Sequence, residues 1–161
     1  MSIQAISVDR SGSSPPPGVD PCLDIVMRLS IPSDAGRIHQ ALIQPEYLET
    51  WITLPGDTAD SRLVAWREGG SYRFDHYRNG RLDLTISGND RVRRRRKMLF
   101  TWKKNADRIA AESLVSIRLC GNFSSTILEL HHTGIVSKQE CEWQRQMWCR
   151  SLDRLCQLFG C

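Results

Sequence analysis

The sequence of 161 residues has no apolar run of the roughly 18 to 20 residues that a membrane-spanning helix needs. Its N-terminus shows no basic region followed by an apolar stretch, the pattern of a secretion signal. The six cysteines form no C-x-x-C pair and are few for this length, so a disulfide-dense scaffold is not indicated. We therefore expect a cytoplasmic protein with reduced thiols and no membrane partner.

The sequence also lacks the local patterns of several enzyme classes. There is no G-x-S-x-G elbow of a serine hydrolase, and no glycine-rich loop between a strand and a helix suits a phosphate. Gly69-Gly70 indicates a turn instead. We therefore expect a binding protein rather than an enzyme, and no cofactor.

Basic residues are concentrated in one place. The net charge is +4, but residues 91–97 hold six of the 22 Lys and Arg residues, so the rest of the chain carries a charge near −2. The apolar share of 40% and the charged share of 25% are those of an ordinary globular protein. Since the chain is not cationic throughout, we do not expect nucleic acid as its partner.

Residues 1–21 collect Ser, Gly and three consecutive prolines without apolar periodicity. Proline cannot enter the hydrogen-bond ladder of a sheet, so this segment indicates a flexible leader. We expect a single domain over residues 22–161, since domains commonly run to roughly 100 to 200 residues.

Apolar spacing predicts a strand over residues 23–30, followed by two short helices. Ser33 is the expected N-cap of the first helix, and Pro45 ends it and permits a second helix toward Trp51. From residue 59 to 133 the apolar period is two, which predicts an antiparallel meander with strands at 60–67, 70–77, 81–92, 97–104, 112–120 and 125–133. Gly88, inside the longest strand, is expected to mark a bulge or bend.

After Gly134 the pattern is helical to the end of the chain. Four apolar residues recur at i, i+4, i+7 and i+11, namely Trp148, Leu152, Leu155 and Phe159. The order of one strand, two short helices, six strands and one long helix predicts an α+β fold. A curved antiparallel β-sheet must wrap the long C-terminal α-helix to bury its apolar stripe.

A resemblance to a known family rests on six segments in this order: IPSDAGRIHQALIQPEYLETW, WREGGSYRF, the strand with Gly88, RRKMLFTW, STILELHHTG and MWCRSLDRLCQLF. The succession is similar to the START-like, helix-grip (SRPBCC) superfamily, and within it to the group named after the activator of heat-shock protein 90 ATPase. The resemblance covers residues 23–159. It implies a helix-grip fold that binds lipids or other apolar molecules, cyclises polyketides or stimulates a chaperone. Met147 stands where the family often has Gly, which implies less space beneath the helix.

Alternation along the strands predicts one set of side chains that faces the long helix. These side chains either fill a core or line a largely apolar pocket with a few polar groups, and the resemblance raises the second interpretation to equal weight. The candidate ligand-binding residues are Trp51, Tyr72, Phe74, His76, Leu84, Phe100, Trp102, Ile117, Leu130, His132, Met147, Trp148 and Leu155.

His76 and His132 are the two candidates for proton transfer or metal binding. Two histidines fall short of the three or four ligands of a zinc site, so no metal is expected. No carboxylate stands at a supporting spacing, because Asp75 and Asp83 have the opposite, solvent-facing parity. We therefore assign no catalytic residue, and a cyclase or hydrolase that uses these histidines stays an alternative.

The cysteines leave the oligomeric state open. Cys149 and Cys156 share a helical face and are expected to pack as small apolar residues. Cys161 is expected to be an exposed thiol that joins two chains in oxidising buffer. Both a monomer and a homodimer are compatible with the sequence.

The leading hypothesis is a protein that binds a small hydrophobic or aromatic ligand, lipid-like or polyketide-like, between the sheet and the C-terminal helix. An alternative from another class is a co-chaperone-like or stress-related interaction module with a chaperone partner, which only the resemblance suggests. The basic run Arg93–Lys97 is predicted at the turn between strands 81–92 and 97–104, where charge is readily solvated. An acidic partner or a phosphate at this turn also stays open.

Overall fold

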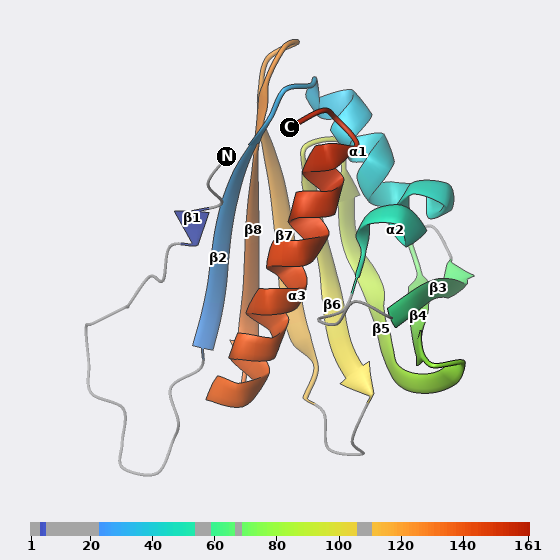
Figure 1. Ribbon diagram of the computed structural model, residues 1–161. Helices are drawn as coiled ribbons and strands as arrows, with labels where there is room; N and C mark the ends of the chain where they lie inside the picture. The colour runs from blue at the N-terminus through green and yellow to red at the C-terminus, as the bar shows by residue number, and fades with distance from the viewer. Residues whose placement is uncertain (1–3, 6–22, 54–58, 67–68, 106–110) are drawn as a thin grey trace, which may run out of the picture.

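The computed structural model describes residues 4–5, 23–53, 59–66, 69–105 and 111–161. One antiparallel sheet, with the strand order β1-β2-β8-β7-β6-β5-β4-β3, curves behind the long helix α3 (Figure 1). The short helices α1 and α2 lie on the same side of the sheet as α3. This arrangement confirms the expected α+β, helix-grip architecture.

The strands are β1 (Gln4–Ala5), β2 (Leu23–Ile31), β3 (Ala59–Trp66), β4 (Ser71–Arg78), β5 (Arg81–Arg94), β6 (Lys97–Asn105), β7 (Ser113–Gly121) and β8 (Thr126–Ile135). The helices are α1 (Ala35–Ile43), α2 (Pro45–Trp51) and α3 (Lys138–Gln157). The expected strand bounds agree with these to within two residues. The sequence does not predict β1, which pairs with β2 from within residues 1–21. The other residues of that segment lie outside the described part of the chain.

Asp34, not the expected Ser33, is the N-cap of α1. Its Oδ1 accepts hydrogen bonds from the amides of Gly36 and Arg37 at 2.9 and 3.1 Å. Ser33 is buried, and its carbonyl accepts a hydrogen bond from Thr126 Oγ1 at 2.8 Å. Both residue types are good caps, so the helix start one residue later decides which of them serves.

Gly88 does not mark a bulge, which was one of the two features expected there. It pairs with Tyr72 in regular register, and the irregularity of the β5–β6 pair lies further on, between Asp90 and Val92. A Cβ atom at Gly88 would collide with the carbonyl oxygen of Thr101 and stand 2.6 Å from the hydroxyl of Tyr72. Glycine is therefore required here because two strands' groups approach its backbone closely.

Helix α3 buries the predicted apolar stripe. Trp148, Leu152 and Leu155 have at most 1% exposure, whereas Phe159 is half-buried beyond the helix end. None of the helices in the described part of the chain has the length and apolar character needed to cross a membrane. With Trp148, Leu152 and Leu155 buried, α3 forms one wall of the core that the curved sheet closes.

The C-terminal cysteines differ from the expectation of reduced thiols. Cys156 and Cys161 form a disulfide across five residues, so Cys161 is not an exposed thiol. Gly160, with a φ of 79°, reverses the chain after α3 and brings Cys161 back over the helix end. Cys149 is a half-buried free thiol on α3, as expected of a packing residue, whereas Cys156 is buried but belongs to the disulfide.

Candidate functional site

An apolar pocket lies between helices α1 and α2 on one side and strands β4 to β6 on the other. It is lined by Leu42, Ile43, Leu48, Trp51, Ile52, Tyr72, Phe74, Asp90, Arg93, Met98, Phe100, Trp102, Ile117 and Trp148. Its volume is about 40 Å³. A water molecule needs roughly 10 to 15 Å³ by this measure, and small-molecule pockets run to roughly 300 to 1,000 Å³. Side chains therefore fill most of the interior.

Aromatic rings from β4, β6 and α3 form the wall of this pocket. The Tyr72 and Phe100 rings meet edge to face at 6.0 Å, and the Trp102 and Trp148 rings lie 4.9 Å apart. Tyr72 and Phe100 sit on strands that flank β5, and they come together because Gly88 has no side chain between them. The missing side chain on β5 is what makes one continuous aromatic surface.

Tyr72 is fixed by its hydroxyl. The hydroxyl donates a hydrogen bond to the carbonyl oxygen of Thr101 at 2.5 Å, across β5. Burial raises the pKa of Tyr72 well above its usual value, and the charges of Asp90 and Glu112 raise it further. Tyr72 is therefore a neutral phenol whose proton is already engaged, and it contributes an aromatic face to the pocket.

An ion pair stands among the apolar lining. Arg93 Nη2 donates to the carboxylate of Asp90, and the two side chains are only 13% and 12% exposed. The register shift between Asp90 and Val92 reverses the inward parity of β5, which turns Arg93 toward the pocket. Asp90 and Arg93 are therefore its charged lining residues within the described part of the chain.

His132 lies beneath the pocket rather than in its lining, and both of its ring nitrogens are engaged. The indole Nε1 of Trp148 donates to His132 Nδ1 at 3.0 Å, so the ring proton is on Nε2. Nε2 lies 2.7 Å from Ser113 Oγ, which in turn donates to the carbonyl oxygen of Trp102. Complete burial lowers the pKa of His132 to about 3. In this tautomer His132 cannot take the proton of Ser113.

His76 is also fully buried and outside the pocket lining. Burial lowers its pKa to about 4, against the smaller opposing effect of Asp75 and Asp83. Strands β5, β6 and β7 separate it from His132. Because each strand spacing is about 4.8 Å, the two histidines do not form an acid/base or metal-binding pair.

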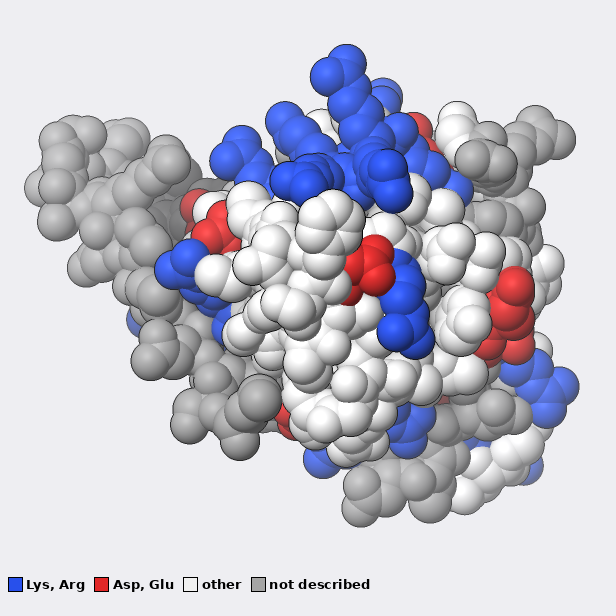
Figure 2. Space-filling view, turned by 90° about the horizontal axis from the view of Figure 1, so that it is seen from above, with Lys and Arg blue, Asp and Glu red and all other residues white. Residues whose placement is uncertain are grey.

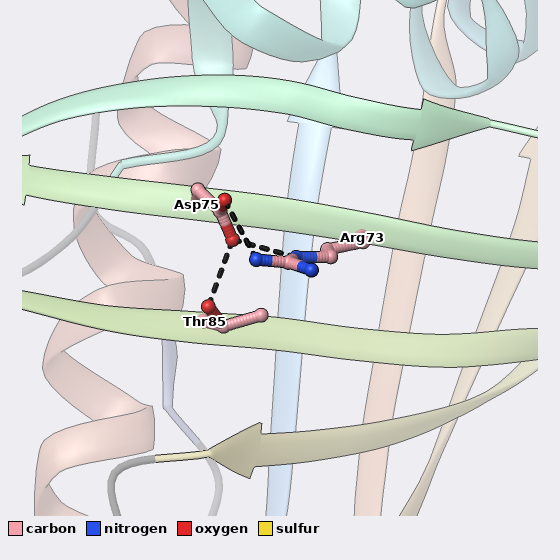
Figure 3. A network of polar contacts seen from close by, with 3 residues as sticks. All are labelled: Arg73, Asp75 and Thr85. Atoms are coloured by element: carbon pink, nitrogen blue, oxygen red, sulfur yellow. Dashed lines mark hydrogen bonds and ion pairs between the residues drawn. The ribbon is translucent and has the colours of Figure 1, made fainter. Parts of the chain in front are cut away.

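Asp75 is buried, although the sequence predicts it to be solvent-facing. Its carboxylate accepts from Arg73 Nε and Nη2 at 2.8 and 2.9 Å and from Thr85 Oγ1 at 2.8 Å (Figure 3). Strand alternation does place Asp75 on the opposite face from Phe74 and His76, as predicted, but Arg73 on the same strand and Thr85 directly opposite cover its carboxylate. The hydrogen bonds from Arg73 are the largest cause of the lowered pKa of Asp75. Asp83 is exposed, as expected, and pairs with Arg78.

The candidate residues divide into two groups. Those that line the pocket are Trp51, Tyr72, Phe74, Phe100, Trp102, Ile117 and Trp148. Those that pack in the core outside its lining are His76, Leu84, Leu130, His132, Met147 and Leu155. Within the described residues, no three His, Cys, Asp or Glu side chains converge on a possible metal position.

Several lining residues were not among the candidates. They are Leu42, Ile43, Leu48, Ile52, Asp90, Arg93 and Met98. Leu42 and Met98 carry a signal in the helical and strand periodicity, but no sequence pattern singles out Asp90. From α3 the lining includes Trp148, whereas α1 and α2 contribute Leu42, Ile43, Leu48 and Trp51. The pocket therefore lies nearer α1 and α2 than the expected place between the sheet and α3.

Solved structures share this fold at low sequence identity. Protein CV1439 from Chromobacterium violaceum has a TM-score of 0.72 and 16% identity, over 86% of this chain and 97% of that chain. CalU16 from Micromonospora echinospora has a TM-score of 0.67 and 20% identity, over 99% of this chain and 87% of that one. DynU16, a protein of the dynemicin biosynthetic locus, has a TM-score of 0.63 and 18% identity, over 83% and 46% of the two chains.

These likenesses show the fold alone, and no curated protein matches the chain in sequence. The family comparison reaches further, because residues 33–160 match one family model. The matched range contains α1, α2, strands β3 to β8 and α3, and so includes every lining residue of the pocket. The chain belongs to the family described as activator of Hsp90 ATPase homolog 1-like protein.

Proposed function

We propose that this protein binds a small hydrophobic or aromatic ligand, lipid-like or polyketide-like, in the pocket between α1, α2 and strands β4 to β6. The observation that carries the proposal is the continuous aromatic wall, which includes Tyr72, Phe100 and Trp102, with one ion pair beside it. Small-molecule sites are generally built in this way, from an apolar lining with a few polar groups. Asp90 and Arg93 offer the ligand an acceptor and a donor.

The ligand needs more room than the present 40 Å³. Helix α2 is the element whose displacement would enlarge the pocket, because Leu48 and Trp51 line it from there. The indole Nε1 of Trp51 donates to the carbonyl oxygen of Ala41 at 2.8 Å, and Ser151 Oγ bonds both the amide and the carbonyl of Thr53. Ligand binding therefore requires α2 to shift, which disturbs these few hydrogen bonds.

Two further considerations support the proposal. DynU16, which shares the fold, belongs to a biosynthetic locus, which is compatible with a polyketide-like ligand. The histidine geometry counts against the enzymatic alternative, because His132 has both nitrogens engaged and neither His76 nor His132 lines the pocket. We propose the cytoplasm as the compartment on the sequence grounds given above.

The test uses the tryptophan side chains as reporters. Trp51, Trp102 and Trp148 line the pocket, whereas Trp143 lies on α3 outside its lining and serves as the internal control. After a screen of lipid and aromatic libraries by native mass spectrometry, a retained compound is titrated while the indole N–H signals are followed by NMR. The expected result is a saturable shift of the three pocket indoles with Trp143 nearly unchanged. A screen that retains no compound, or shifts confined to Trp143, would contradict the proposal.

A further inference from the structure

Three chain tips meet at one end of the molecule. They are the turn between β5 and β6, the turn between β7 and β8, and the start of α1. Together they line a hollow of about 390 Å³, formed by Asp34, Ala35, Gly36, Arg95, Arg96, Gly121, Asn122 and Phe123. Figure 2 looks onto this end and shows Lys and Arg side chains gathered in one area. We use the term basic hairpin surface for Arg94, Arg95, Arg96, Lys97 and Phe123.

The four cations of this surface are exposed, and none of them has an ion pair with another described residue. Among the described residues, no carboxylate lies within 4.0 Å of the charged groups of Arg94, Arg95, Arg96 or Lys97. Elsewhere on the same sheet, Arg78 and Arg91 each have a carboxylate partner. This turn therefore brings together four adjacent cations that have no carboxylate partner among the described residues.

The surroundings of Arg95 add to the positive potential. Its guanidinium packs over Gly36, in the first turn of α1, where the helix dipole places partial positive charge. Nearby, the pKa of His39 is lowered, first by burial and then by the charges of Arg93 and Arg95. Solubility alone does not require this concentration of charge, and an anionic partner would relieve it.

Phe123 supplies an apolar contact beside the cations. Its side chain is 97% exposed and lines the same hollow as Arg95 and Arg96. The turn that carries it is rigid, because Asn122 Oδ1 accepts hydrogen bonds from the amides of Ser124 and Ser125, both at 3.0 Å. An exposed aromatic side chain on a hydrogen-bonded turn next to arginines is typical of a binding anchor.

We propose that the basic hairpin surface binds an acidic segment of a partner protein, whose carboxylates pair with Arg95 and Arg96 and whose apolar side chain covers Phe123. This surface is distinct from the apolar pocket, and the inference does not depend on a ligand there.

The hollow fits a peptide better than a nucleic acid or a bilayer. The carboxylate of Asp34 is among its lining groups, and a nucleic acid, with a phosphate at every nucleotide, would place an anion against it. A peptide brings backbone N–H donors as well as carboxylates, so it can satisfy both Asp34 and the arginines. A bilayer surface is too broad to enter the hollow, whereas a peptide can reach the groups that line it.

The test measures binding of a fluorescein-labelled peptide of alternating glutamate and leucine to the full chain by fluorescence anisotropy. The matched peptide with glutamine in place of glutamate, single-stranded oligothymidylate and phosphatidylglycerol vesicles are measured in parallel. The acidic peptide should bind, and its affinity should fall as salt is added. The double variant R95Q/R96Q should weaken it by roughly tenfold, and F123S should weaken it by roughly tenfold at unchanged charge.

The matched control is R81Q/R154Q, which removes the same charge from exposed positions outside this surface. It should change the affinity by less than roughly twofold. Circular dichroism checks that each variant is folded. Absence of peptide binding, equal loss in the control, or stronger binding of oligothymidylate or vesicles through Arg95 and Arg96 would overturn the proposal.

Discussion

The indole nitrogen of Trp148, on α3, donates a hydrogen bond to Nδ1 of His132, on β8, at 3.0 Å. This contact joins the helix to the sheet through two side chains that are at most 1% exposed. It also sets the tautomer of His132, since a nitrogen that accepts from an indole carries no proton. The histidine that the sequence offers as a catalytic candidate is therefore a neutral structural residue.

The first prediction concerns the pH dependence of stability. The folded state holds the pKa of His132 at about 3 and that of His76 at about 4, whereas both have an ordinary value of 6.5 in the unfolded chain. Stability is therefore fully present above pH 6.5, and it falls as the pH drops from there toward the folded pKa values. In this range each histidine should contribute a loss of about 1.4 kcal/mol per pH unit.

Replacing His132 by Gln separates the contribution of His132 to this pH dependence from that of His76. Well above pH 6.5 the variant should be about 1 to 3 kcal/mol less stable, because a flexible amide replaces an imidazole ring that packs edge to face against Trp102 and Trp148. As the pH falls, the wild type loses stability through both histidines and the variant through His76 alone, so the difference should narrow. Urea-unfolding free energies across this pH range provide the measurement. A difference that is constant with pH would show that His132 titrates alike in both states.

The second prediction contrasts two aspartates on neighbouring strands. Asp75→Ala should lower the free energy of unfolding by about 1 to 3 kcal/mol, because Arg73 and Thr85 lose their shared partner. Asp83→Ala removes an exposed ion pair with Arg78 and should cost less than about 1 kcal/mol. Urea denaturation of both variants decides the order, and equal costs would refute the account of the buried network.

The third prediction tests why Gly88 is glycine. Gly88→Ala places a methyl group against the Thr101 carbonyl and the Tyr72 hydroxyl, so β5 or its neighbours must shift. The free energy of unfolding should fall by about 2 kcal/mol or more. Asn89→Ala, at the exposed next position, keeps the backbone bond to Thr101 Oγ1 and should change stability by less than about 0.5 kcal/mol. A tolerated alanine at residue 88 would mean that the close approach is unnecessary.

Much of the fold follows from the sequence because local signals agree. Period-two alternation separates the strands, and Asn79-Gly80, with φ angles of 51° and 73°, forms the turn that its residue types favour. The short strand β1 was not predictable, since two residues carry no period. The disulfide of Cys161 depends on the chain reversal at Gly160, which cysteine spacing does not show.

The site was predictable only in part. Strand parity identified Tyr72, Phe74, Phe100 and Trp102 as inward-facing, but parity cannot tell filled space from a cavity. Whether the space is filled or open depends on where α2 lies. Arg93 was read as one of five turn residues, because the register shift before it, which reverses parity, has no sequence signal. Asp75 is likewise buried because Thr85 lies opposite it. The sequence does not show the register of β4 and β5 that places Thr85 there.

The most direct test of ligand binding is to fill the pocket. Ile52→Trp adds an indole at a lining position, whereas Leu82→Trp makes the same kind of change at an exposed position on β5. Each protein is titrated with Nile red, a neutral aromatic dye, and its folding is checked by urea denaturation. Saturable binding to the wild type and to Leu82→Trp, weakened roughly tenfold or more by Ile52→Trp, is expected. Equal affinity in all three folded proteins, or no saturable binding to the wild type, would contradict a ligand site in this pocket.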